Sequence, residues 1–424
     1  MDAKLRHGRA SLTVSFFVQG VCFALLVTRI PAIQDRYGLS DAYLPVFLAA
    51  VPILAGVGSI LTEHLVKRIR PGAVLRWVQP VVCLALLGAG AGTELWQLAT
   101  TLGVFGLAVG GLDASMNMLG VSLQRTYGRS IMLGFHAAYS LGGILGASLA
   151  WGGAHWKLSL AVLYGPVVAV LVPVVLVVSR WYVDQARQAR HQPPAPPLVP
   201  QSNGGRKATP PAAETRAGAG LSMTLLLPLC LVMTCAYIGD STVANWSAKY
   251  LQDVLGSSEQ LATVPFNVYM VTTLIGRTVG DRGVRRFGAV AVVRAGTVTA
   301  AAGFAVVAAA PGAWWGMLGF TLLGFGLSVI VPQTFAAAGR LFPDASDAAV
   351  ARLNIFNYVG FLVGSPLVGG LGDLWGYRGA MLVPMALVLV TLVYARSFGA
   401  EPTRYGGGHE RPRTADVGRG SNGL

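Results

Sequence analysis

Apolar residues run through this chain in stretches of about 20, and short polar segments separate the stretches. That is the length an α-helix needs to cross a hydrocarbon core roughly 30 Å thick. Twelve stretches can be marked to within about four residues at each end, at 11–33, 42–62, 73–92, 96–121, 131–152, 158–181, 222–248, 260–280, 289–310, 313–338, 350–371 and 377–397. The pattern predicts an all-α membrane protein with twelve transmembrane helices.

Composition supports the same class of protein. Of the 424 residues, 54% are hydrophobic and 12% are charged, whereas about a quarter of the residues of a soluble domain are charged. The first stretch is longer than the apolar part of a signal peptide and has no small-residue cleavage site after it, so we expect it to remain attached.

The basic residues are distributed unevenly along the chain. Of the 32 Lys and Arg, the segments that join odd to even stretches hold five, and the remaining 27 fall on the opposite side; the five are Arg29, Arg36, Lys157, Lys249 and Arg378. Cytoplasmic loops carry such an excess. We therefore expect a multi-pass protein of the cytoplasmic (inner) membrane with both termini in the cytoplasm. The net charge of +14 then reflects topology, and no nucleic-acid partner is expected.

The composition changes sharply in the middle of the chain. Residues 184–220 hold seven of the 23 prolines and no apolar stretch, which is typical of a disordered linker. This segment divides the chain into an N-terminal six-helix half at 1–183 and a C-terminal six-helix half at 221–398. A disordered cytoplasmic tail is expected at 399–424.

The two halves match one another at a constant offset of 218 residues. QDRYGLS (34–40) falls on QDVLGSS (252–258), GSILTEHLVKRI (58–69) falls on GRTVGDRGVRRF (276–287), and Pro166 falls on Pro384. A register that holds over roughly 180 residues without a gap indicates an internal repeat. The sequence thus predicts two parallel six-helix repeats.

Two parallel halves joined by a cytoplasmic loop are the architecture of the major facilitator superfamily. GDRGVRRFG (280–288) resembles the loop signature of that superfamily. Four further segments resemble its MosC-like and YbjJ-like branch, namely TRIPAIQDRYGLS, GGLDASMNMLGVSLQ, GRSIMLGFHAAYSLGGILGA and ANWSAKYLQDVLG. The resemblance implies a secondary active transporter that moves a small organic solute by alternating access.

The resemblance also implies a set of gating residues. Asp281, Arg282, Arg285 and Arg286 would close the cytoplasmic side in an outward-open state. The first-half copy, with Glu63 and Lys67, departs from the signature, which leaves the strength of its contact open. Ordinary positive-inside charge is the alternative for these residues. Arg29, near the outer end of the first stretch, is either a gating residue or a side chain that reaches the interface.

Polar residues inside two apolar stretches suggest a proton-coupling site. Asp113 and Asn117 are one helical turn apart, as are His136 and Ser140, with Tyr139 beside them. Asp113 and His136 both lie roughly 7 Å toward the cytoplasm from the centres of their stretches, at about 1.5 Å per residue. Ionisable groups in hydrocarbon usually face a cavity or an ion path. Asp113 and His136 are therefore candidates for proton coupling. The alternatives are a structural tie from Asp113 to Arg125, Arg129 or helix ends, and a satisfied core histidine at His136.

The repeat extends this polar face to the second half. At the 218-residue offset, His136, Tyr139 and Ser140 correspond to Asn354, Asn357 and Tyr358, whereas Asp113 corresponds to Val331. The two faces are therefore expected to line one substrate cavity. Further candidates for this cavity are Gln19, Asn267 and Gln333, each alternatively a polar contact between helices, and Asp240 near the end of the seventh stretch. Amide and aromatic groups together suit a neutral polar ring.

Other classes of function find little support in the residues. A nucleotide-binding P-loop is absent, and the six histidines are scattered without the spacing of a metal site. We expect neither an enzyme nor a cofactor or metal. The expected partners are a small-molecule solute, protons and the lipid bilayer, with the protein as a monomer. Drug or natural-product efflux by proton antiport is one alternative, and a non-transporting membrane sensor is another.

Overall fold

The computed structural model describes residues 3–39, 44–183, 222–258, 261 and 264–399. The predicted linker at 184–220 lies outside the described residues, as does the predicted tail beyond its first residue. Each of the six stretches predicted in the first half is helical. They correspond to α1 (Ala3–Thr28), α3 (Leu44–Leu65), α4 (Pro71–Ala91), α5 (Leu95–Tyr127), α6 (Met132–His155) and α7 (Leu160–Val178), with a short α2 (Ile30–Tyr37) after α1.

The second half repeats this order. Its helices are α8 (Met223–Lys249), α10 (Val264–Phe287), α11 (Ala289–Ala309), α12 (Ala313–Leu327), α13 (Ile330–Leu341), α14 (Ser346–Ala380) and α15 (Leu382–Tyr394). The tenth stretch was predicted as one helix but forms two, because Pro332 has no N–H to donate to the carbonyl of Ser328. The eleventh and twelfth stretches meet at Gly376, whose φ of 77° is a conformation that glycine adopts readily.

The lengths and compositions of these helices fit a membrane-spanning bundle. Among the described residues, nine helices are long and apolar enough to cross a membrane, and a bent pair, Leu374–Ala380 with Leu382–Phe398, makes ten. α3 contributes a shorter apolar helix at Ala49–Leu65. α10, which carries five charged residues between Arg277 and Arg286, is not among them. Together these helices account for the twelve predicted stretches.

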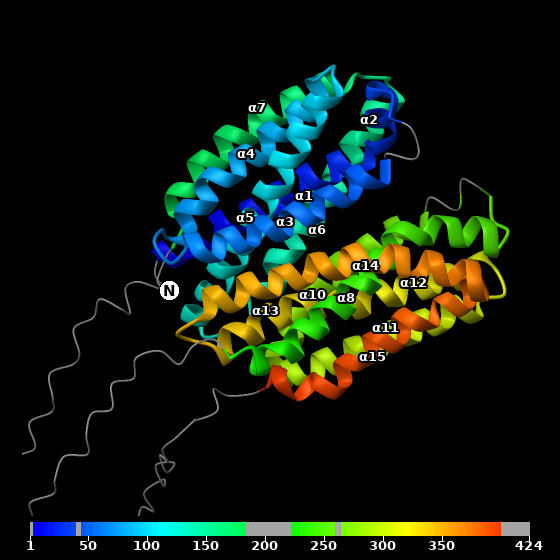
Figure 1. Cartoon of the computed structure of the whole chain (residues 1–424). Coiled ribbons are helices and arrows are strands. Elements are labelled where there is room, and N and C mark those ends of the chain that lie inside the picture. Colours follow the sequence, from blue (N-terminus) through cyan, green and yellow to red (C-terminus); the bar gives the residue numbers. More distant parts are fainter. Residues whose placement is uncertain (1–2, 40–43, 184–221, 259–260, 262–263, 400–424) are drawn as a thin grey trace, which may run out of the picture.

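The helices form two groups that repeat one another (Figure 1). Adding 218 to the bounds of α4 gives the bounds of α11. The packing repeats as well, because α1 packs on α6 in the first group and α8 packs on α14 in the second. The predicted pair of parallel six-helix repeats is therefore confirmed.

Glycines allow equivalent helices to approach closely in both groups. A Cβ atom on Gly142 of α6 would lie 2.0 Å from the backbone oxygen of Phe17 in α1, and one on Gly360 of α14 would lie 2.5 Å from that of Thr234 in α8. Gly142 and Gly360 are 218 positions apart. Small residues are what membrane helices use where their backbones touch.

The two groups meet along two symmetry-related pairs of helices. α3 packs against α14, and α6 packs against α10. The groups converge where α1 begins and splay apart where α2 lies (Figure 1). The end of the bundle at which α1 begins is called the closed end below, and the opposite end, which carries α2, the open end.

Candidate functional site

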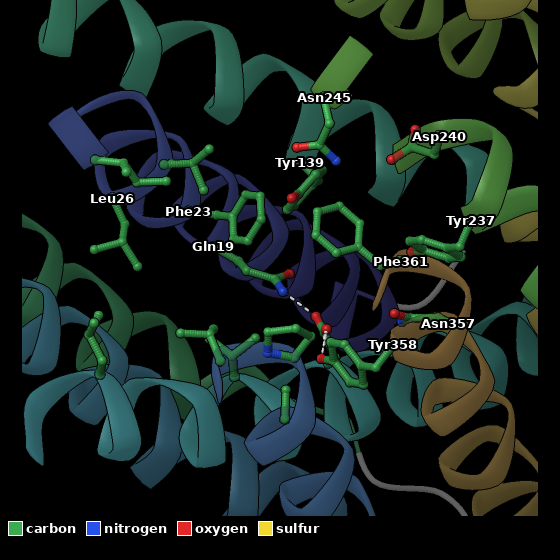
Figure 2. A pocket seen from close by; sticks show the side chains of 18 of the residues that line it. Gln19, Phe23, Leu26, Tyr139, Tyr237, Asp240, Asn245, Asn357, Tyr358 and Phe361 are labelled. Atoms are coloured by element: carbon green, nitrogen blue, oxygen red, sulfur yellow. Dashed lines mark hydrogen bonds between the residues drawn. The ribbon is translucent and has the colours of Figure 1, made fainter. Parts of the chain in front are cut away.

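A cavity of about 280 Å³ lies between the two groups of helices. It has room for roughly nine water molecules at ~30 Å³ each, which is the size of a small organic molecule. Its wall toward the open end is apolar, with Ile30, Ile33 and Leu98 among the lining residues. Figure 2 shows the polar and aromatic side chains around it. Those that carry polar groups are Gln19, Asp113, Asn117, His136, Tyr139, Tyr237, Asp240, Asn245, Arg277, Asn357 and Tyr358.

Asp113 of α5 is held by side chains from both groups of helices. The amide of Gln19 in α1 donates to Oδ1, and the hydroxyl of Tyr358 in α14 donates to Oδ2 (Figure 2). Asn117, one turn further along α5, donates to the backbone oxygen of Asp113 at 2.9 Å. Arg125, the alternative partner predicted from sequence, instead donates to the backbone oxygen of Pro343 and to Ser346.

His136 of α6 lines the same cavity and is buried. Its ring lies 5.3 Å from that of Phe16 and 6.3 Å from that of Phe335, centroid to centroid. Its Nε2 atom is buried and has no hydrogen-bond partner among the described residues. The structure thus places His136 and Asp113 at one cavity, while the carboxylate of Asp113 takes its hydrogen bonds from Gln19 and Tyr358.

Asp240 and Arg277 add further charge to the cavity. Asp240 of α8 accepts a hydrogen bond from Tyr269 of α10. Arg277 of α10 donates from Nη1 to Ser140 Oγ at 2.6 Å and to the backbone oxygen of His136 at 3.4 Å, which joins α10 to α6. Arg277 was not predicted, because it was assigned to the basic loop at the end of its stretch. The sequence does hold a signal for it, since Arg277 lies one turn before Asp281, inside the apolar stretch predicted at 260–280.

Four of the predicted cavity residues lie elsewhere. Ser140 accepts from Arg277, as described, and is not among the lining residues. Asn354 donates to Ser59 at 2.8 Å across the interface between α14 and α3, and it accepts from Asn357 at 2.8 Å. Gln333 approaches Ser130 at 3.5 Å, and Asn267 is exposed on α10. The other predicted residues line the cavity together: Gln19, Asn117, Tyr139, Asp240, Asn357 and Tyr358.

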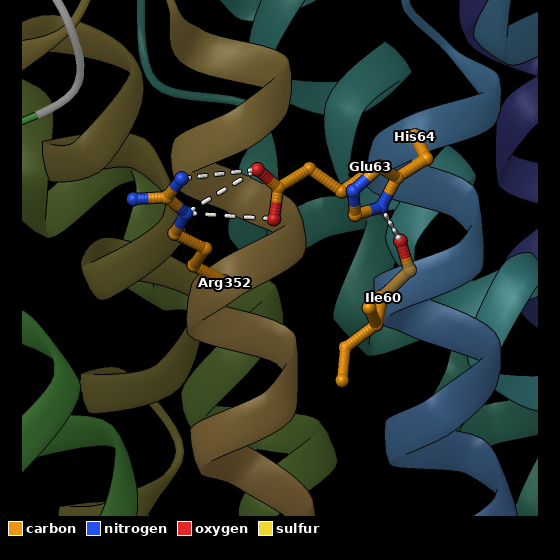
Figure 3. A network of polar contacts seen from close by, with 4 residues as sticks. All are labelled: Ile60, Glu63, His64 and Arg352. Atoms are coloured by element: carbon orange, nitrogen blue, oxygen red, sulfur yellow. Dashed lines mark hydrogen bonds and ion pairs between the residues drawn. The ribbon is translucent and has the colours of Figure 1, made fainter.

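An ion pair joins the two groups at the closed end. Glu63 of α3 accepts from the guanidinium of Arg352 in α14, with Nη2 at 3.2 Å from Oε1 (Figure 3). The side chain of Glu63 is 9% exposed and that of Arg352 is 32% exposed, so water screens this pair less than a surface pair. His64, beside Glu63, donates or accepts at Ile60 within its own helix.

A second contact at the closed end involves Asp281 of α10. Its carboxylate accepts from Ser130 Oγ at 2.5 Å and from the backbone N–H of Gly134 at 3.0 Å. Arg285 donates to the backbone oxygen of Ser130 at 2.9 Å. The remaining predicted gating residues at this end, namely Lys67, Arg282 and Arg286, are exposed.

Arg29 lies at the opposite end of α1 from these contacts. It directly precedes α2, and its Nε atom is buried without a hydrogen-bond partner among the described residues. Its side chain is therefore withdrawn into the protein in part, rather than directed wholly to the membrane surface.

Comparison with known sequences finds similarity to transporters and membrane proteins. A sequence model described as Major Facilitator Superfamily matches residues 229–417. A protein of Yersinia pestis named an uncharacterized MFS-type transporter is 28% identical over 391 residues, which are 92% of this chain and 95% of that protein. The membrane protein MosC of Rhizobium meliloti is 24% identical over 388 residues, which are 90% of this chain and 87% of MosC.

Comparison with solved structures shows the same fold. The transporter FucP, described as a member of the Major Facilitator Superfamily in the outward conformation, superposes with a TM-score of 0.72 at 18% identity and covers 92% of this chain and 98% of its own. The human organic anion transporter MFSD10 superposes with a TM-score of 0.74 at 14% identity, covering 93% and 100%. At these identities the likeness concerns the fold alone.

Proposed function

Because this chain resembles members of the major facilitator superfamily in sequence and in fold, we propose that it is a proton-coupled secondary transporter that moves a small organic solute by alternating access. The observation that carries the proposal is the position of Asp113. This carboxylate lies at a cavity between the two halves and accepts hydrogen bonds from both, through Gln19 and Tyr358. An ionisable group at that position can couple its own protonation to the relative movement of the halves.

The state described here would face outward. The distribution of Lys and Arg favours a cytoplasmic location for the closed end, so that the cavity is reached from outside. The solute would enter past Ile33 and Leu98. Its release would require the contacts of Glu63 and Asp281 to break and the halves to rock about the cavity. The protein is expected to act as a monomer in the cytoplasmic membrane.

Protonation of Asp113 would weaken the link between the halves. An ionised carboxylate accepts hydrogen bonds that are roughly twice as strong as those to a neutral group. When Asp113 takes up a proton, the bond from Tyr358 loses this charge assistance, and α5 is held less firmly to α14. His136, which lines the same cavity with a free ring nitrogen, is the second candidate for proton transfer.

Two forms of proton coupling, with opposite directions of solute movement relative to the proton, fit this proposal. Proton symport of a sugar-like or other polar solute is one form, and a structural neighbour is described as a fucose:proton symporter. Proton antiport of a metabolite, drug or natural product is the other. A membrane sensor that binds solute without moving it is a different class of function and would show binding without flux.

Proton movement in proteoliposomes tests the proposal. Vesicles loaded with a pH-sensitive dye would be exposed to a panel of polyols, sugars, amino acids, organic acids and cationic drugs. We expect at least one solute to change the internal pH, with the sign giving symport or antiport. Asp113→Asn should abolish proton-driven accumulation while solute exchange persists. Asp253→Asn, which changes an aspartate that is 46% exposed, should transport normally. Unchanged proton-driven flux in Asp113→Asn would remove Asp113 from the coupling mechanism.

A further inference from the structure

Arg277 is a cation within the bundle, and no carboxylate of the described residues lies within ion-pair distance of it. It lies within α10 and lines the cavity. The described part of the chain holds two ion pairs, Lys249 with Asp253 and Glu63 with Arg352, and neither involves Arg277. A charged residue at membrane depth costs about 2.5–3.5 kcal/mol even on lenient scales, and such residues usually mark binding sites. The position of Arg277 therefore requires a function.

The guanidinium is oriented by the opposite half and keeps part of its hydrogen-bonding capacity. Nη1 is used by Ser140 and by the backbone oxygen of His136. Nε is buried and has no partner among the described residues, and the same holds for Nε2 of His136. A buried polar group without a partner costs about 1–3 kcal/mol. Arg277 and His136 contact one another and both line the cavity, so an acceptor that reached these nitrogens would complete their hydrogen bonding.

The carboxylates of the cavity do not supply that acceptor. Asp113 accepts from Gln19 and Tyr358, and Asp240 accepts from Tyr269. Both carboxylates accept hydrogen bonds from neutral groups. Neither is within ion-pair distance of Arg277, because the two ion pairs found among the described residues involve other side chains. Beyond Ser140 and the backbone oxygen of His136, the described residues supply no acceptor for the guanidinium, so its remaining donors are open to an acceptor from a bound solute.

We propose that Arg277 and His136 form a carboxylate subsite, so that the transported solute is a small organic acid. This inference rests on the proposed function and specifies its substrate class. A carboxylate matches the planar fork of a guanidinium better than a hydroxyl or a carbonyl does. His136 Nε2 adds a second donor when it carries a proton. The body of the acid would lie against the aromatic rings of Tyr139, Tyr237 and Phe361, which line the same cavity.

Matched pairs of acids and amides test this subsite on the purified, full-length protein in detergent. The pairs are benzoate with benzamide, nicotinate with nicotinamide, lactate with lactamide and glucuronate with glucuronamide, and the readout is the concentration that raises the unfolding temperature half-maximally. We expect at least one acid to bind ten times or more as tightly as its amide. Arg277→Gln should remove this preference, and Arg277→Lys should keep only part of it because Lys cannot present a fork. Arg294→Gln, which changes an exposed arginine of α11, should leave it intact.

The outcomes separate this inference from the proposed function. No shift with any acid, or an acid preference that survives in Arg277→Gln, would overturn the carboxylate subsite. A purely structural role of Arg277 would lower the unfolding temperature of the variant but would leave the ratio between acid and amide unchanged. If neutral solutes drive proton movement in proteoliposomes while acids neither bind nor move, the subsite is wrong and the transport proposal stands. If acids bind with the expected preference and no solute moves protons, the subsite stands and proton coupling is wrong.

Discussion

Glu63 and Asp281 are equivalent residues of the two halves, 218 positions apart, and each binds the equivalent position of the opposite half. Glu63 pairs with Arg352, and Asp281 accepts from the backbone of Gly134. Arg352 and Gly134 are themselves 218 positions apart. The closed end is therefore held by a symmetric pair of contacts in which the positive partner is present on one side only.

The same relationship holds one turn nearer the cavity. Ser59 with Asn354 on one side corresponds, at the same offset, to Arg277 with His136 on the other. The first contact joins two neutral side chains, whereas the second places a guanidinium against a backbone carbonyl. The internal repeat thus places contacts at equivalent positions of the two halves. Different residues at these positions make the two contacts chemically different.

Breaking the ion pair at the closed end should favour opening on that side. Arg352→Gln removes about 1 kcal/mol or more from the closed state, which is roughly a fivefold change in the equilibrium between conformations. Distances between spin labels at Arg70→Cys and Phe287→Cys, both exposed positions, would measure it. The four native cysteines are buried and would compete little for the label. In a protein that already carries Arg352→Gln, adding Glu63→Gln should change the label distances little further. An unaltered distance distribution in Arg352→Gln would contradict the gating role of this ion pair.

Removing the hydroxyl of Tyr358 should also shift the equilibrium between conformations toward the state in which the closed end opens. Tyr358→Phe deletes a hydrogen bond to a carboxylate that joins α14 to α5, and such bonds contribute about 1.5–3 kcal/mol. We expect a tenfold or larger shift toward opening of the closed end, measured with the same labels. Tyr182→Phe is the matched control, since Tyr182 bonds Ser15 and Gln79 within the first half. Equal shifts in both variants would show that the effect is general destabilisation.

The close contact of α6 with α1 at Gly142 predicts that a larger residue at this position lowers stability and leaves the cavity unchanged. Gly142→Ala should force α6 away from α1 and lower stability by about 1–3 kcal/mol, as overpacking does. Thermal unfolding in detergent would measure it. Gly165→Ala on α7, where a Cβ would meet no atom within 4 Å, should be neutral. A Gly142→Ala protein as stable as the parent would mean that α6 and α1 can separate without cost.

Asn357 should contribute directly to solute binding. It lines the cavity and donates to Asn354, which leaves its side-chain oxygen available to a solute. Asn357→Ala should weaken binding of a transported solute roughly two- to tenfold, since a hydrogen bond contributes about 0.5–1.5 kcal/mol. Equilibrium binding to the purified protein would give the affinity. Ser148→Ala, at an exposed position of α6, is the control, and an unchanged affinity in Asn357→Ala would remove this residue from the site.

The sequence predicts the fold well because a membrane imposes a fixed helix length. All twelve stretches correspond to helices in the described residues, and the offset that relates QDRYGLS to QDVLGSS also relates α4 to α11. Helix ends are less well predicted. α1 begins at Ala3 instead of residue 11, and α5 extends to Tyr127 instead of 121. Hydrogen bonding along a helix continues past the apolar stretch wherever polar residues can reach water or another helix.

The cavity residues were predictable as a class but not one by one. Polar residues in apolar helices pointed to Asp113, His136 and Asn357, and all three line the cavity. Asn354 and Ser140 instead face the helix of the opposite half, because their orientation depends on how α14 and α6 rotate against their neighbours. Gln333 lies beyond the break after α12, which a single continuous stretch does not reveal. These placements are set by packing between the halves.

An opening at one end also determines where a membrane voltage acts. Water in the cavity brings Asp113 close to the electrical potential of the open end, so that most of the voltage falls across the layer of protein around Glu63 and Asp281. One elementary charge carried through 100 mV changes the free energy by about 2.3 kcal/mol. The formal charges of Arg277 and Asp240 are opposite and cancel. With the closed end in the cytoplasm, an inside-negative voltage of about 100 mV would favour the outward-facing state roughly fiftyfold while Asp113 is ionised. A proton on Asp113 would remove this preference.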